Sequence, residues 1–132
     1  MTVPEATKLH QDVVTLRGHA QNLLDMGESL GADQGKAALE IARDSRELAS
    51  QIEEFIKLAV LYQRMQCAPD KAEVMNWLPG SLDVTRGSLD LEIKDVNRQL
   101  TAITNQAALS EGETIRNNLR DISQTLAIYS YQ

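Results

Sequence analysis

Apolar residues recur at alternating steps of three and four along four stretches of the chain, which is the spacing of amphipathic helices that bury one face. The first stretch predicts a helix over residues 4–30, with the apolar positions Leu9, Val13, Leu16, Ala20, Leu23 and Leu30, and with Gly27 filling one gap. The second predicts a helix over residues 34–66, with Ala38, Ile41, Ser45, Leu48, Ile52, Phe55, Ala59 and Tyr62. The repeat changes phase between them, so we expect the chain to reverse there, with Gly31 closing the first helix in the left-handed conformation and Asp33 capping the second.

The stretch CAPDKAEVMNWLPGS interrupts this pattern and is bounded by Pro69 and Pro79. Between the prolines, one apolar face consists of Val74, Trp77 and Leu78. We therefore predict a short extra helix over residues 70–78. Its tryptophan is expected to cover an open end of the core. The alternative is that Trp77 is exposed as an anchor for a partner, because tryptophan often dominates the binding energy of protein interfaces.

Two further repeats predict helices over residues 82–108 and 111–130. The third repeat consists of Leu82, Leu89, Ile93, Val96, Leu100, Ile103 and Ala107, and the fourth of Ile115, Leu119, Ile122, Leu126 and Tyr129. Between them, SEGE offers a capping box, in which Ser110 bonds forward to the amide of Glu113 and the glutamate side chain reaches back.

These elements predict an all-α fold with a single domain over residues 1–132. Its four helices form an antiparallel up-down-up-down bundle with coiled-coil-like packing, and the short extra helix lies in the connection between the second and third helices. The composition agrees with this prediction. A chain of 132 residues with 42% apolar content is large enough to close one core, and the low aromatic content of 4% is typical of helical proteins.

The net charge of −6 is spread over the whole chain, which disfavours binding to nucleic acid, because that needs clustered Lys and Arg. No uncharged apolar run approaches the roughly 18 residues that span a bilayer, so we expect no direct membrane insertion by this segment. The single cysteine, Cys67, excludes an internal disulfide and is expected to be an inert thiol. As written, the sequence predicts a cytoplasmic location, or an extracytoplasmic one if the segment is an excised sensor domain.

The polar residues give little support for catalysis or metal binding. His10 and His19 are nine residues apart, which places them on opposite sides of a helix. Neither follows a glutamate at the spacing used by metal sites in helical bundles. Ser45, the polar residue within an apolar repeat, is expected to bond back to the carbonyl of Ile41. We therefore predict that the protein is not an enzyme and has no catalytic, cofactor-binding or metal-ligating residues.

The segment VTLRGHAQNL (residues 14–23) resembles the motif of histidine phosphotransfer domains, which are four-helix bundles with an exposed phospho-accepting histidine. The family positions are occupied by Leu16, Arg17, Gly18, Ala20 and Leu23. Val14 stands where the acceptor histidine belongs, and His19 lies about 140° and about 7.5 Å farther along the helix. The resemblance implies a degenerate relative that lacks the acceptor histidine. The other interpretation is that this segment is only the surface of a bundle.

These observations favour a non-enzymatic interaction or regulatory module that acts through its outer helical faces. Its expected partner is another protein or a second copy of the chain, with Trp77, Tyr129 and Tyr131 as contact residues. The alternative is a ligand-sensing input domain of a membrane chemoreceptor or sensor kinase, because an even number of helices returns both ends of the chain to one end of the bundle. That alternative implies a small-molecule ligand.

Overall fold

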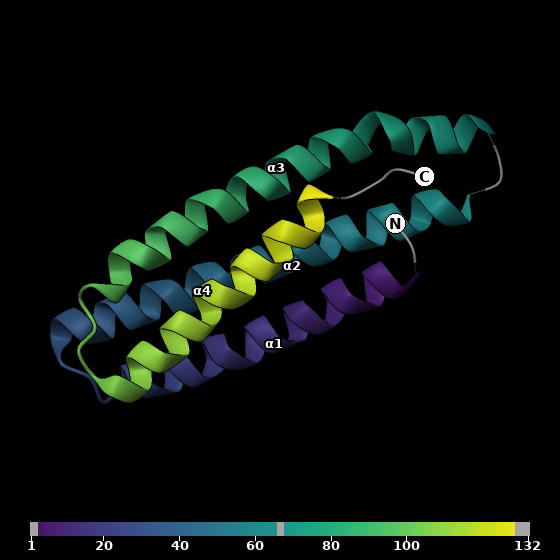
Figure 1. The fold of residues 1–132 in the computed structure, drawn as a ribbon. Helices are drawn as coiled ribbons and strands as arrows, with labels where there is room; N and C mark the ends of the chain where they lie inside the picture. The colour runs from purple at the N-terminus through teal and green to yellow at the C-terminus, as the bar shows by residue number, and fades with distance from the viewer. Residues whose placement is uncertain (1–2, 66–67, 129–132) are drawn as a thin grey trace.

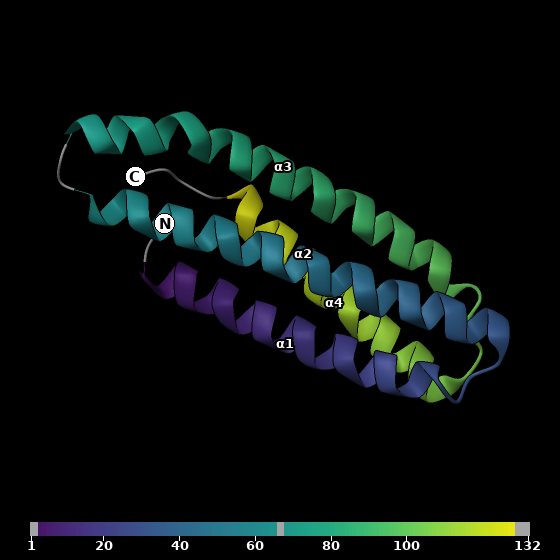
Figure 2. The ribbon, with the colours of Figure 1, turned by 180° about the vertical axis from the view of Figure 1, so that it is seen from behind.

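The computed structural model describes residues 3–65 and 68–128, which form four helices: α1 (Val3–Gly27), α2 (Ala32–Arg64), α3 (Ala68–Leu100) and α4 (Gln106–Ala127). Both α1 and α3 pack against α2 and α4, so the helices form the four corners of an up-down bundle. In Figure 1, α4 lies in front of α2, and in Figure 2 the order is reversed. The prediction of an all-α four-helix bundle is confirmed.

The core is built from the predicted apolar faces. Its largest fully buried side chains are Phe55, Leu9, Leu16, Leu23, Ile41, Ile52, Leu78, Leu89, Ile115, Leu119 and Ile122. One predicted core position is wrong: Ala107 is exposed and Ala108 is buried instead, because α4 begins earlier than predicted and therefore presents a different side chain to the core. Within the described ranges, no helix combines the length and the apolar character needed to cross a bilayer.

α3 continues through Pro79 as one helix, so the predicted short helix over residues 70–78 and the break before residue 82 are wrong. Proline has no N–H to bond the carbonyl of Met75, a loss that costs about 3 kcal/mol inside a helix. One buried face nevertheless crosses the proline without a change of phase and consists of Val74, Leu78, Leu82, Thr85 and Leu89. Burial of this continuous face offsets the missing bond.

Trp77 points away from the core, and 67% of its surface is exposed. The prediction that Trp77 covers an open end of the core is therefore wrong. Trp77 is exposed, as the alternative prediction had it. The reason is helical geometry, since Trp77 is rotated by about 100° from its neighbour Leu78, which is buried. A contact between Trp77 and a partner stays a prediction.

The turn between α1 and α2 lies earlier in the chain than predicted. The backbone N–H of Leu30 donates to the carbonyl of Gly27 at 3.4 Å, and α1 ends at Gly27 rather than at residue 30. Gly31 does not adopt the left-handed conformation; with φ −61° it is the N-cap of α2, which leaves Asp33 in the first turn. A Cβ on Gly35 would lie 3.0 Å from the Gly27 carbonyl oxygen, so any other side chain would crowd the backbone of α1 where the two helices approach.

The connection between α3 and α4 also lies earlier in the chain than predicted, because α3 ends at Leu100 and not at residue 108. Asn105 caps α4, since its side-chain oxygen accepts a hydrogen bond from the backbone N–H of Ala108 at 3.0 Å. The predicted capping box at Ser110 is wrong. Ser110 lies inside α4, where its carbonyl accepts from the Thr114 hydroxyl at 2.9 Å.

The side chain of Gln34 links the start of α2 to the connection between α3 and α4. The Oε1 atom of Gln34, in the first turn of α2, accepts hydrogen bonds from the backbone N–H groups of Thr104 and Asn105, both at 2.9 Å. The start of α2 is thereby fixed to the segment that leads into α4.

Candidate interaction surface

The basic residues of the segment that resembles the phosphotransfer motif bind to neighbouring helices. Arg17 Nη1 donates to Glu53 Oε1 of α2 at 2.6 Å, and this bond lowers the pKa of Glu53. His19 Nδ1 lies 2.6 Å from Glu111 Oε2 of α4. Between them, Gly18 is exposed, and nothing lies within 4 Å of the place a Cβ would take. The segment therefore links α1 to α2 and to α4.

Trp77, Val84 and Leu91 form a row of exposed apolar side chains on α3, which we call the α3 row. Their exposed fractions are 67%, 60% and 70%. Because they are seven residues apart, about two helical turns, they lie on the same side of the helix. Exposed apolar residues are common one at a time on protein surfaces, whereas three in register on one helix are the pattern of an interaction face.

A groove of about 610 Å³ lies beside the α3 row, between α2 and α3. On the α3 side it is lined by Trp77, Gly80 and Val84, and on the α2 side by Glu54 and Leu58, among others. No atom lies within 4 Å of where a Cβ of Gly80 would be, so this glycine keeps the groove open between the two large side chains. The groove offers apolar surface with a carboxylate beside it.

Carboxylates gather farther along the same contact between α2 and α3. One oxygen from each of Asp44, Glu92 and Asp95 lies within 4.8 Å of the others, and we call these three residues the acidic cluster. Asp95 accepts a hydrogen bond from Arg98. The Oε1 atom of Glu92 is buried and has no hydrogen-bond partner among the described residues. The cluster is therefore only partly neutralised by the protein's own side chains.

Burial and mutual repulsion change the acidity of this cluster. Burial, and then the charges of Asp44, Asp95 and Glu47, raise the pKa of Glu92 to about 8. The pKa of Asp44 is also raised, by burial first and by Asp95 second, although Arg43 opposes this. A cation placed among these oxygens would relieve the repulsion. Carboxylates accept strong hydrogen bonds from ammonium and guanidinium groups, and they are also ligands for hard divalent cations.

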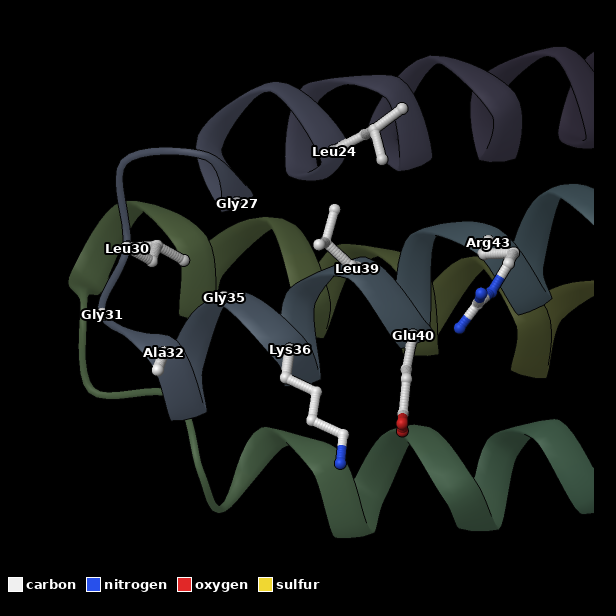
Figure 3. Close-up of a pocket in the computed structure, with 10 residues that line it drawn as sticks. All are labelled: Leu24, Gly27, Leu30, Gly31, Ala32, Gly35, Lys36, Leu39, Glu40 and Arg43. Atoms are coloured by element: carbon white, nitrogen blue, oxygen red, sulfur yellow. The ribbon is translucent and has the colours of Figure 1, made fainter.

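A second hollow, of about 550 Å³, lies at the turn between α1 and α2 (Figure 3). Its apolar surface comes from Leu24, Leu30 and Leu39, and Figure 3 shows Leu24 and Leu39 facing each other between the two helices. Lys36 and Arg43 of α2 add basic groups to its lining, and Glu40, which accepts a hydrogen bond from Gln99 of α3, adds a carboxylate. The hollow could hold a small molecule with an apolar body and a negative charge.

The structure tests only some of the residues that the sequence singled out. Tyr129, Tyr131 and Cys67 lie outside the described residues. Ser45 is fully buried, but its hydroxyl has no hydrogen-bond partner in the described part of the chain, so the predicted bond to the carbonyl of Ile41 is wrong.

The acidic cluster and most of the α3 row were missed, although the sequence carries a signal for each. Val84 and Leu91 repeat at steps of seven from Trp77. Polar residues repeat at steps of four and three along α2, at Glu40, Asp44, Glu47, Gln51 and Glu54. This spacing places the acidic residues on one face of α2.

The chain matches no protein-family model, no curated protein and no solved structure. The resemblance to histidine phosphotransfer domains therefore rests on residues 14–23 alone. Val14 is exposed on α1, as the acceptor histidine of that family is, but its side chain has no nitrogen to carry a phosphoryl group. The α3 row and the acidic cluster are thus the stronger guides to function.

Proposed function

We propose that the protein is a non-enzymatic interaction module that binds a partner protein through the outer face of α3. The observation that carries this proposal is the α3 row, because Trp77, Val84 and Leu91 are exposed in register on one helix. Full burial of a large apolar side chain contributes about 1.5–3 kcal/mol. Three such side chains supply about 5–9 kcal/mol, which is comparable to the loss of translational and rotational freedom on binding, so neighbouring contacts along the same face must add to them.

A photo-crosslinking residue at two positions tests this proposal. Placed at position 91 of the full chain, in cells of the source organism, it should link the protein to a defined partner that mass spectrometry identifies. Position 14 is the matched control, since Val14 is also an exposed apolar residue but lies on α1. The purified partner should then bind the wild-type chain, and Leu91→Glu should weaken that binding by at least about tenfold. Identical products from positions 91 and 14 would contradict the proposal.

A second candidate function is the recognition of a small molecule in the hollow between α1 and α2, as the expectation of a sensing domain implies. The combination of apolar walls with Lys36 and Arg43 favours it. Octanoate, a probe with an apolar tail and one negative charge, should then raise the melting temperature of the wild type and leave that of Leu39→Glu unchanged. An unchanged wild-type melting temperature at millimolar octanoate would eliminate this candidate for that class of ligand.

A further inference from the structure

The α3 row continues directly into the acidic cluster. Asp95 lies four residues after Leu91, so the two residues are neighbours on the same side of α3. The distance from Trp77 to Leu91 along the helix is about 21 Å, and Asp95 adds about 6 Å. Apolar surface and carboxylates therefore form one strip, long enough to contact about five turns of another helix.

The carboxylates of this strip come from both helices. Asp44 and Glu47 of α2 face Glu92 of α3 closely enough to raise its pKa. Within the described residues, no ion pair joins Asp44 or Glu92 to a basic side chain, and Glu92 Oε1 is buried without a hydrogen-bond partner. The basic groups nearby are Arg43, which acts on Asp44 from a distance, and Arg98, which is bound to Asp95. Asp44 and Glu47 thus supply negative charge at one end of the strip, and apolar surface forms the rest.

We propose that this strip binds a basic amphipathic helix of a partner protein, whose apolar side chains cover Trp77, Val84 and Leu91 and whose Lys or Arg side chain enters the acidic cluster. The inference rests on the proposed function and adds the chemistry of the partner. Charge complementarity distinguishes this occupant from a second copy of the chain. Each copy carries a net charge of −6, and a symmetric dimer through this face would bring the exposed Asp83 and Asp90 of the two copies near one another.

Trp77 supplies the probe for the test, because it is the single tryptophan of the chain and is largely exposed. We would titrate the full chain with a tryptophan-free peptide of about 21 residues, with leucine on one face and lysine on the other, which is roughly 32 Å long as a helix. The matched control peptide has glutamate in place of every lysine. The lysine peptide should shift the Trp77 emission to shorter wavelength in a saturable manner, and the glutamate peptide should not.

Substitutions locate the binding site. Leu91→Glu, which changes an exposed position and leaves the core intact, should weaken binding of the lysine peptide by at least about tenfold. The double change Asp44→Asn with Asp95→Asn should weaken it by about five- to tenfold, since it removes two carboxylates that meet the basic side chain. The matched controls are Val14→Glu on α1 and Glu113→Gln on α4, both at exposed positions, and both should leave the affinity within about twofold of wild type.

Three results would overturn the inference. If the glutamate peptide binds as tightly as the lysine peptide and Leu91→Glu weakens both, the α3 row binds helices but the basic chemistry is wrong, and the proposed function stands. If neither peptide binds while the crosslinked partner does, the partner is not a basic helix. If the free protein dimerises in sedimentation experiments and Leu91→Glu separates the dimer, a second copy covers the strip.

Discussion

Replacing Glu92 by glutamine removes an ionisable group from the acidic cluster while nearly preserving the volume of the side chain. Burial, together with Asp44, Asp95 and Glu47, raises the pKa of Glu92 from 4.5 to about 8. The folded protein therefore holds this proton more tightly than the unfolded chain does. Ionisation of Glu92 consequently opposes folding, and its contribution to the free energy of unfolding falls as the pH rises from about 4.5 to about 8 and is constant above that range.

The magnitude follows from the interval between the two pKa values. A tenfold change in proton affinity corresponds to about 1.4 kcal/mol, so the interval from 4.5 to about 8 sets an upper limit of about 5 kcal/mol. Glu92 is only partly buried, and solvent screens the charges of its neighbours. We therefore expect Glu92→Gln to increase the free energy of unfolding by about 1–2 kcal/mol above pH 8, where the glutamate is ionised.

Urea unfolding followed by circular dichroism, at about pH 5 and about pH 9, measures this effect. The stabilisation by Glu92→Gln should be present at the higher pH and nearly lost at the lower one, where Glu92 is already neutral. Glu113→Gln, at an exposed position of α4, should give the same small change at both. A loss of stability at the higher pH, or an equal gain at both, would refute the electrostatic reasoning.

Three further predictions concern the fold, each measured as the free energy of unfolding. Gly80→Ala should stabilise the protein by about 0.5–1 kcal/mol, because a Cβ meets nothing within 4 Å there. Gly35→Ala should destabilise it by about 1–3 kcal/mol, because its Cβ would lie 3.0 Å from the Gly27 carbonyl oxygen. Equal effects of the two would contradict this. Ile122→Ala should lose about 2–5 kcal/mol, since the side chain is fully buried, and a loss below about 1 kcal/mol would place it outside the core. Asn105→Ala should lose about 1 kcal/mol by removing the cap of α4, and no loss would show that the cap contributes nothing.

The sequence was sufficient to predict the bundle, because burial of an apolar face depends on the spacing of residues along a helix. It was not sufficient at Pro79, where local chemistry predicts a break but the buried face from Val74 to Leu89 continues across the proline. Local sequence signals were also insufficient to predict where α4 starts. Asn105 and Ser110 both have the chemistry of a cap, and α4 begins at the earlier one, which Gln34 binds from α2. Tertiary contacts of this kind are not visible in a local pattern.

The candidate site was harder to predict than the fold. The sequence pointed to Trp77, but its exposure depended on whether α3 continued through Pro79. The acidic cluster needs the register of α2 against α3, which brings Asp44 close to Glu92 and Asp95. A charged repeat on one helix looks the same in sequence whether it faces water or a neighbouring helix.

The hydrogen bonds of Gln34 have a consequence for how the bundle opens. Its side chain accepts hydrogen bonds from the backbone N–H groups of Thr104 and Asn105, 70 and 71 residues away along the chain, in a connection where Ile103 is buried and its neighbours are exposed. These two amides should exchange their hydrogens with solvent more slowly than the neighbouring exposed amides of the connection, and Gln34→Ala should remove this protection. Their exchange rates would then measure how often this end of the bundle opens locally.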